Sequence, residues 1–323
     1  MTNTKKRSHT FLLDYGIVGV LILLLIIFTF ASDNFLRVNT IFTILKQISI
    51  TGIVSIGMCF VILTGGIDLS VGSIAGASAV MAAMLMHASI PIPVALLIAA
   101  AIACAYGTIN GLLITKVAMP PLISTLGMMT ALRGMAYIIT GGLPVFGFST
   151  VYGLFASSSL WVIPYPVILL IFIFLIARFV LVRTTTGRYI YSVGGNGEAS
   201  RLSGINVTFI TTFAYSLSGF LSGIAGLVLL SRTNSGQPSS GSGYEMDAIT
   251  AVVLGGCSLS GGQGNISLVM VGVLIMGVLT TGMQMCNIND YVQQLVKGLV
   301  LIAAVAFSSI SKQIQTKLTS KME

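Results

Sequence analysis

Long apolar runs that carry almost no charge constrain this chain more than any other feature of its sequence. Two of them are "GIVGVLILLLIIFTFA" (16–31) and "PVILLIFIFLIARFVLV" (166–182). A helix rises about 1.5 Å per residue, so about 20 apolar residues cross the roughly 30 Å hydrocarbon core of a bilayer. Only 7% of the 323 residues are charged, whereas a soluble globular chain carries about 25%. The sequence therefore predicts an all-α polytopic membrane protein.

Ten apolar blocks are candidates for transmembrane helices. They lie at about 11–31, 41–63, 70–88, 92–115, 122–140, 162–182, 208–231, 247–258, 265–286 and 291–309. The block at 247–258 is too short to cross as a regular helix, because a span needs about 17–25 residues. We predict ten crossings within one transmembrane domain, residues 1–323. Eight crossings, with both glycine-rich segments re-entrant, is the alternative.

Basic residues favour the count of ten, because cytoplasmic loops of membrane proteins retain Lys and Arg. They include Lys5, Lys6 and Arg7 near the N-terminus, Arg183, Arg188 and Arg201 around one loop, and Lys312, Lys317 and Lys321 near the C-terminus. Ten crossings place all three groups on the cytoplasmic side of a bacterial inner membrane. The formal net charge of +8 then reflects topology, and nucleic acid is not an expected partner.

A glycine pair interrupts the apolar sequence between the second and third blocks, within "VILTGGIDLSVGSIAGASAV" (61–80). The octapeptide GGIDLSVG at 65–72 aligns without gaps on GGCSLSGG at 255–262, which gives the shared pattern G-G-x-x-L-S-x-G. Paired glycine-interrupted segments in two halves of a membrane protein indicate a transport pathway. The sequence therefore predicts an internal repeat with two interrupted segments.

An interrupted helix exposes backbone groups that lipid cannot satisfy, so these groups face a cavity or other protein. The candidate pathway residues are polar or small and lie in or beside the interrupted segments and spans: Gly65, Gly66, Asp68, Ser70, Asn110, Thr125, Gly255, Gly256 and Ser260. For Asp68, a helix N-cap and a pathway residue are equally good interpretations. Uncharged donors and acceptors suit a neutral solute. We expect Arg133 and Lys297 to pair with helix ends or aspartates.

The sequence contains no obvious means of powering transport. None of its eight acidic residues lies in the middle of a predicted span, which argues against a carrier coupled to protons or sodium. It also lacks the G-x-x-x-x-G-K-[ST] phosphate loop. The two histidines, His9 and His87, form no metal-binding or catalytic pattern. We therefore expect no enzyme activity, no catalytic residue and no metal site.

The loop at about 184–207, "TTTGRYIYSVGGNGEASRLSGINV", carries signals for a short cytoplasmic helix. Gly194 and Gly195 suggest a turn, and Asn196 is a suitable N-cap for the helix that follows. Glu198 falls in its first turn near the positive end, and Gly204 is expected to end it. A short rigid helix between two spans suits a motor protein that pushes on the membrane domain. A plain amphipathic connector is the alternative.

Five stretches resemble the membrane permeases of ATP-binding-cassette importers for pentoses and hexoses, the ribose-type sugar permeases. This family shares a superfamily with the branched-chain amino-acid permeases. The stretches are "GMCFVILTGGIDLSVGSIAG" (57–76), "YGTINGLLITKVAMPPLISTLGMMTALRGMAYIITGG" (106–142), "GRYIYSVGGNGEASRLSGINV" (187–207), "YEMDAITAVVLGGCSLSGGQG" (244–264) and "YVQQLVKGLVLIAAV" (291–305). They follow the family's order over nearly the whole chain. Cys257 stands where relatives often carry a hydroxyl residue.

The resemblance implies a transport subunit that binds no cofactor itself. Such permeases pair as two copies, bind ATPase subunits that hold ATP and magnesium, and receive a monosaccharide from an extracytoplasmic binding protein. The loop at 184–207 matches the family's ATPase-docking region. The coupling candidates are Gly195, Asn196, Glu198, Ala199, Arg201 and Gly204. The alternative function is a stand-alone secondary carrier or facilitator for a small neutral solute.

Overall fold

The computed structural model describes residues 3–148 and 152–320, with side chains placed for 16–148, 152–307 and 309. The elements are α1 (Asn3–Ala31), α2 (Val38–Leu63), α3 (Val71–His87), α4 (Ile92–Thr115), α5 (Pro121–Thr140), α6 (Gly153–Ser157), β1 (Ser159–Leu160), β2 (Ile163–Pro164), α7 (Tyr165–Arg183), α8 (Thr185–Gly195), α9 (Gly197–Leu202), α10 (Val207–Thr233), α11 (Tyr244–Leu254), α12 (Ile266–Met285) and α13 (Asp290–Ser320). The strands form one short antiparallel hairpin. The described chain is therefore built almost entirely of helices, as predicted.

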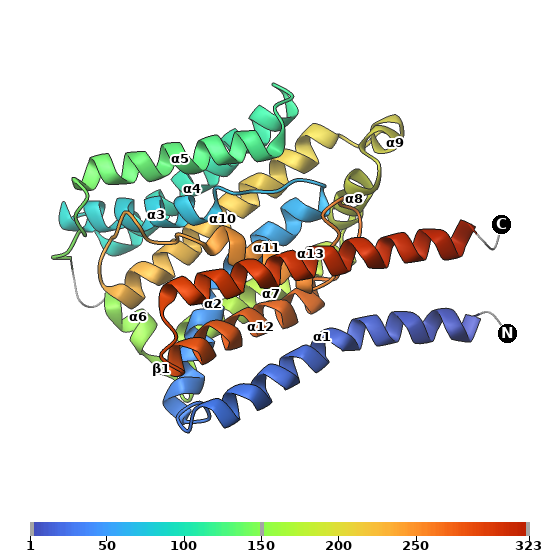
Figure 1. Ribbon diagram of the computed structural model, residues 1–323. Helices are drawn as coiled ribbons and strands as arrows, with labels where there is room; N and C mark the ends of the chain where they lie inside the picture. The colour runs from blue at the N-terminus through green and yellow to red at the C-terminus, as the bar shows by residue number, and fades with distance from the viewer. Residues whose placement is uncertain (1–2, 149–151, 321–323) are drawn as a thin grey trace.

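The long helices lie lengthwise in one bundle, with α2 and α10 in its interior (Figure 1). In the most apolar 18-residue window, 83% of α2 is buried but only 6% of α13. Large apolar side chains on the outer helices are exposed, such as Leu97 on α4, Ile138 on α5 and Phe172 on α7. Exposed apolar surface of this extent marks contact with a membrane or another protein. The chain is a multi-pass membrane protein.

Within the described residues, seven helices are long and apolar enough to cross a membrane: α2, α4, α5, α7, α10, α12 and the first part of α13. Two further apolar helices are shorter, Gly16–Ala31 in α1 and Val71–His87, which is α3. The block expected at 247–258 forms α11, which has 11 residues. Helix length and composition thus identify seven candidate crossings among the described residues and do not confirm the predicted count of ten.

Glycines allow α10 to pack backbone to backbone against its neighbours. A Cβ on Gly219 would contact the Ala103 carbonyl oxygen of α4 at 2.5 Å, and a Cβ on Gly226 would overlap the Ala75 carbonyl of α3. Gly223 also packs against Ala103. The spacing of these three glycines predicts this single packing face, because residues three and four apart share one side of a helix. The prediction is confirmed.

A non-helical segment precedes each of the two short inner helices, 64–70 before α3 and the turn-rich 234–243 before α11. A Cβ on Gly72, in the first turn of α3, would overlap the Gly241 carbonyl and a carboxylate oxygen of Glu245. The N-terminal ends of α3 and α11 therefore lie next to each other inside the bundle. From there α3 runs toward α6 and α11 runs the opposite way, toward α8 (Figure 1). Two positive helix ends thus meet in the interior.

Both glycine pairs end a helix by the same hydrogen-bond pattern. After α2, the Gly65 N–H donates to the Ile62 carbonyl and the Gly66 N–H donates to the Val61 carbonyl. After α11, the Gly256 N–H donates to the Val253 carbonyl and the Cys257 N–H donates to the Val252 carbonyl. The residue in the left-handed conformation is Gly65 in the first case (φ 85°) and Gly256 in the second (φ 78°). These glycine-terminated caps are equivalent. The gap-free alignment pairs Gly65 with Gly255, whereas the equivalent left-handed residue is Gly256. The residue-by-residue repeat is therefore not confirmed.

Candidate translocation pathway and coupling segment

Asp68 lies near the end of the non-helical segment 64–70 and is fully buried. Its Oδ1 atom accepts hydrogen bonds from the backbone N–H (3.0 Å) and the hydroxyl (2.6 Å) of Ser70, which begins α3. Its Oδ2 atom accepts a bond from the hydroxyl of Ser218 on α10, at 2.9 Å. The carboxylate therefore closes a local turn at the start of α3 and also ties that turn to α10.

Two further candidates lie beside Asp68. The amide of Asn110, on α4, donates to the Ser70 hydroxyl at 2.9 Å, and the Oδ1 atom of Asn110 has no partner among the described residues. The Thr125 hydroxyl, on α5, lies 3.3 Å from the Ile67 carbonyl and 2.9 Å from the Pro121 carbonyl. The structure thus brings four predicted pathway residues, Asp68, Ser70, Asn110 and Thr125, to one place where α3, α4, α5 and α10 converge.

The Asp68 network predicts a loss of stability on truncation. Asp68→Ala removes the acceptor of three hydrogen bonds, and each buried donor left unsatisfied costs about 1–3 kcal/mol. We therefore expect a clear fall in the melting temperature of the purified protein. The matched control is Asp33→Ala, because Asp33 is an exposed acid in the turn between α1 and α2. Equal melting temperatures for the two variants would contradict this account of Asp68.

Glycines from three segments meet at one end of the bundle. We call Leu63–Gly65, Gly194–Gly195 and Gly261–Gly262 the glycine junction. The Gly262 N–H donates to the Leu63 carbonyl at 3.0 Å. A Cβ on Gly194 would overlap that same carbonyl oxygen, and a Cβ on Gly261 would lie 2.7 Å from the Gly65 nitrogen. The end of α8 is therefore packed directly on the end of α2 and on the loop after α11.

The second glycine pair lies away from the Asp68 network. A Cβ on Gly255 would lie 2.5 Å from Val269, so Gly255 packs on α12, and Gly256 is exposed. Ser260 is also exposed, and its carbonyl oxygen would lie 3.6 Å from a Cβ on Gly65. The second segment thus meets the first at the glycine junction, through Ser260 and the residues after it.

The predicted short helix is present as α9, with both caps. The Asn196 side chain accepts a hydrogen bond from the Ala199 N–H at 2.9 Å. At the other end, Gly204 is left-handed (φ 83°), and the Ile205 N–H donates to the Ser200 carbonyl at 3.0 Å. Caps at both ends hold a helix that is too short to be stable alone.

The prediction of a chain reversal at Gly194 and Gly195 is wrong, because both residues are helical and end α8. The chain bends instead at Asn196, whose backbone is extended (φ −161°, ψ 100°). Gly194 is required for close packing at the glycine junction. Gly194 can be helical and still approach the Leu63 carbonyl closely, because glycine has no side chain.

Glu198 and Arg201 form an ion pair on the outer face of α9. Their side chains are 65% and 68% exposed, and the Arg201 Nη2 and Glu198 Oε1 atoms are 2.7 Å apart. The hydrogen bond that Arg201 donates to Glu198 raises the pKa of Arg201. Such exposed pairs contribute little to stability. Both charged groups are therefore available to a partner protein.

Of the two cations well inside predicted spans, Lys297 pairs with an aspartate as expected, whereas Arg133 binds loop carbonyls. Arg133, on α5, donates to the carbonyl oxygens of Pro238 and Ser240, both at 2.8 Å, in the segment that leads into α11. Lys297, on α13, contacts Asp247, on α11, with 2.9 Å between Nζ and Oδ2. These contacts hold the start of the short helix α11 between α5 and α13.

Sequence reasoning missed the contribution of α10 to the site. Ser218 binds Asp68, and the Tyr215 hydroxyl lies 3.3 Å from the Ile67 carbonyl. A Cβ on Gly66 would overlap that hydroxyl, so Gly66 is required by Tyr215. The sequence signal for Ser218 lies in "SLSGFLSGIAG" (216–226), where serines recur at the glycine spacing, but this spacing by itself indicates only helix packing.

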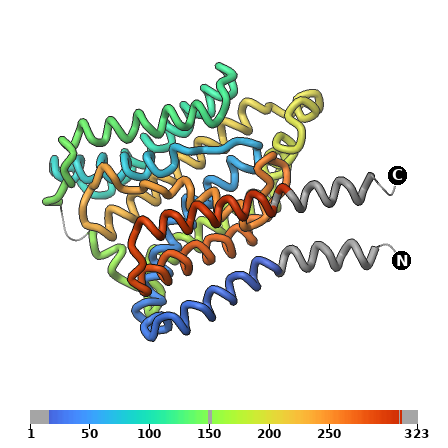
Figure 2. Tube along the Cα trace, viewed as in Figure 1, coloured from blue at the N-terminus to red at the C-terminus, as the bar shows by residue number. Residues whose placement is uncertain are grey.

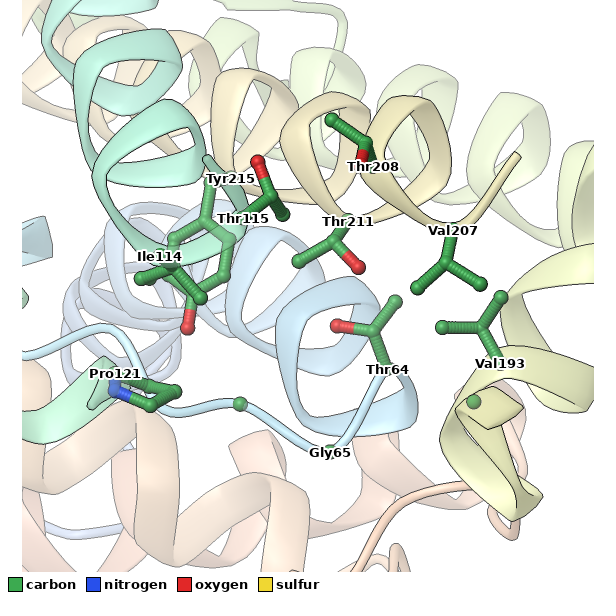
Figure 3. A pocket seen from close by; sticks show the side chains of 12 residues that line it. Thr64, Gly65, Ile114, Thr115, Pro121, Val193, Val207, Thr208, Thr211 and Tyr215 are labelled. Carbon is green, nitrogen blue, oxygen red and sulfur yellow. The ribbon is translucent and has the colours of Figure 1, made fainter. Parts of the chain in front are cut away.

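A cavity of about 310 Å³ lies on the α8–α9 side of the interrupted segment. Its walls come from the segment itself (Thr64, Gly65, Gly66), the end of α4 (Ile114, Thr115), Pro121, Val193, Gly197 and the start of α10 (Val207, Thr208, Thr211, Tyr215). Figure 3 shows the side chains of Thr64 and Thr211 facing each other across it. The cavity thus has walls from both the predicted coupling segment and the interrupted segment.

Comparison with known proteins gives consistent matches over most of the chain. The family described as "Branched-chain amino acid transport system / permease component" matches residues 40–305. The ribose import permease RbsC of Bacillus subtilis is 43% identical, over 88% of this chain and 89% of the relative. Escherichia coli K12 RbsC is 42% identical, over 90% and 91%. No solved structure gives a significant match.

A more distant relative extends the range of solutes named. The galactose/methyl galactoside import permease MglC of Escherichia coli K12 is 36% identical, over 95% of this chain and 97% of the relative. The named relatives are thus import permeases for different monosaccharides.

Proposed function

The chain belongs to the family of branched-chain amino-acid transport system permease components, and from this premise we propose that it is the permease subunit of an ATP-binding-cassette importer for a monosaccharide. The observation that carries the proposal is its 36–43% identity, over nearly full length, to import permeases for ribose and galactose. The chain serves as the membrane pathway. Hydrolysis of ATP takes place on a separate ATPase subunit, where ATP and magnesium bind.

The polar groups of the candidate pathway support a neutral solute. Ser70, Asn110 and Thr125 supply hydroxyl and amide groups, and Asp68 is engaged by two serines. Arg133 is occupied by backbone carbonyls. An anionic amino acid or phosphate ester would call for a free cation beside the network. A sugar needs only uncharged donors and acceptors.

The segment α8–α9 is proposed as the docking site of the ATPase. It combines an exposed charged face, Glu198 with Arg201, and rigid caps at Asn196 and Gly204. Gly195 joins it to the glycine junction, and Ala199 contributes the N–H that Asn196 binds. A movement of α8 imposed by the ATPase would reach the interrupted segment directly, as a rigid-body change.

We propose ten crossings, with the termini and α8–α9 on the cytoplasmic side of the bacterial inner membrane. Each short inner helix, α3 or α11, would complete one crossing together with the non-helical segment before it. Support comes from the coloured parts of α1 and α13, which both extend from the β1 end toward the α8–α9 end (Figure 2). The terminal basic residues behind this orientation lie outside the described side chains. A second permease copy and an extracytoplasmic sugar-binding protein complete the proposed importer.

Purification of the tagged protein in mild detergent tests the proposal. We expect an ATPase to copurify near one per permease, and its activity in nanodiscs to rise when a sugar-loaded binding protein is added. Reconstituted complexes should then accumulate ribose or galactose against a gradient. A permease that purifies alone and equilibrates solute across liposomes would instead establish a secondary carrier or facilitator.

The docking segment gives a second test. Glu198→Ala combined with Arg201→Ala is expected to abolish uptake and ATPase copurification. The membrane level of the protein should stay normal, because an exposed ion pair contributes little to stability. Lys116→Ala, an exposed cation at the end of α4, is the control and should transport normally. Normal uptake by the double variant would exclude α9 as the coupling element.

A further inference from the structure

We propose that the cavity between Thr64, Thr211 and Tyr215 binds the transported solute on its way to the cytoplasm, as a site for a small neutral polyhydroxylated molecule. This inference rests on the proposed function and names the place where the solute is held before release. The cavity's volume of about 310 Å³ lies at the lower end of the range for small-molecule sites, about 300–1,000 Å³.

The hydroxyl of Thr211 is the main evidence for a ligand. Threonines inside helices usually donate to the carbonyl four residues earlier, as Thr115 and Thr250 do here. Thr211 is only 9% exposed and lines the cavity, yet its hydroxyl makes no hydrogen bond to any residue in the described part of the chain. A polar solute in the cavity would satisfy it.

Other groups in the walls are also polar and uncharged. The hydroxyl of Thr64 donates to the Val61 carbonyl at 2.7 Å, and its oxygen still has a free lone pair for a solute donor. The backbone carbonyls of Gly65 and Gly66 accept no hydrogen bond from any described residue. The helix interruption thus provides acceptors, and Thr211 provides a free donor. Sugars present many hydroxyl groups, each of which both donates and accepts.

The charge of the walls argues against other ligands. Of the residues that line the cavity, all described, none has a charged side chain. A phosphate or a lipid headgroup would require Lys or Arg, and a carboxylate would require the same. Apolar residues, such as Ile114 and Val207, supply flat surface for the sugar's C–H face. A neutral polyol is therefore the best chemical fit.

The position of the cavity links binding of the solute to the movements of the transport cycle. Val193 and Gly197, at the junction of α8 and α9, form one wall. Gly65 and Gly66 form another wall and belong to the interrupted segment. Movement of α8–α9 relative to that segment would therefore change the size of the cavity. We infer that the solute is released when the ATPase displaces this wall.

Uptake kinetics test the role of Thr211. Thr211→Val preserves shape but removes the hydroxyl, and we expect the maximal uptake rate to fall about fivefold, the effect of one neutral hydrogen bond. Thr211→Ser keeps the hydroxyl and should restore transport, which a purely structural role would not require. Thr250→Val is the control, because Thr250 is buried but bonds its own helix on α11.

Protection of a cysteine gives the direct test. In Thr211→Cys protein in nanodiscs, the rate of modification by N-ethylmaleimide is measured at position 211 by peptide mass spectrometry. Saturating D-ribose or D-galactose should slow it at least about fivefold, and polyethylene glycol of equal osmolarity should not. Thr208→Cys, on the same wall, serves as a second reporter. No protection at either position, or no labelling at either, would overturn the proposal.

These experiments distinguish failure of the cavity proposal from failure of the proposed function. If the wild-type complex accumulates sugar while neither cysteine is protected, the importer stands and the cavity is not its inner site. If no sugar is accumulated by the wild-type complex, the proposed function itself fails. A cavity that holds only water would give unprotected cysteines and normal uptake by Thr211→Val.

Discussion

Gly194→Ala is expected to abolish sugar uptake, although it adds a single methyl group on the cytoplasmic side of the bundle. The added Cβ would overlap the Leu63 carbonyl oxygen and approach the Gly262 nitrogen. Both contacts are with backbone, which cannot move aside as a side chain can. Overpacking of this kind costs about 1–3 kcal/mol. It would also push α8 away from the interrupted segment, so uptake should be lost even where the protein still reaches the membrane.

The neighbouring glycine provides an exact control. Gly195 lies in the same last turn of α8, and a Cβ there would meet no described atom within 4 Å. Both substitutions gain the same helix propensity, about 1 kcal/mol for alanine over glycine. Gly195→Ala should therefore transport normally. Uptake of labelled sugar, normalised to protein in the membrane, decides the comparison, and equal uptake by both variants would disprove the importance of the close backbone contact that Gly194 makes in the glycine junction.

The helices could be predicted from sequence because each depends on local signals. Apolar blocks gave bounds close to those of α2, α4 and α12, and the cap signals at Asn196 and Gly204 correctly located α9. The number of crossings could not be fixed in this way. Helix α11 has 11 residues, and α3 has 17, so each crossing would depend on a non-helical segment that has no periodicity to detect.

The candidate site was predictable only in part, for a physical reason. A glycine pair and an aspartate in an apolar run are unusual enough to be noticed one residue at a time. The partners of Asp68 come from α3 and from Ser218, on α10, so they require the tertiary arrangement. Gly194 shows the same limit: its sequence context suggests a turn, whereas its role is a backbone contact with Leu63, more than a hundred residues away in the chain.

Lys297→Met is expected to cause a large loss of stability, because it leaves the buried carboxylate of Asp247 without its partner. Asp247 is 6% exposed and lies 2.9 Å from the Lys297 ammonium group. Removing one partner of a buried pair leaves an uncompensated charge, which costs about 3–5 kcal/mol. Helix α11 is too short to be held by its own length, so its position should depend on this link to α13. We expect a lower melting temperature in detergent and reduced uptake.

The double variant Asp247→Asn with Lys297→Met separates the charge from the contact. It loses the ion pair but leaves no buried charge, and replacing both partners of a buried pair is often nearly neutral. The double variant should therefore recover most of the melting temperature lost by Lys297→Met, whereas Lys116→Met, at an exposed site, should change little. If the double variant is as unstable as the single one, the Lys297 side chain acts through packing. If it is stable but inactive, the ion pair is needed for transport itself, because α11 is then folded but no longer linked by charge to α13.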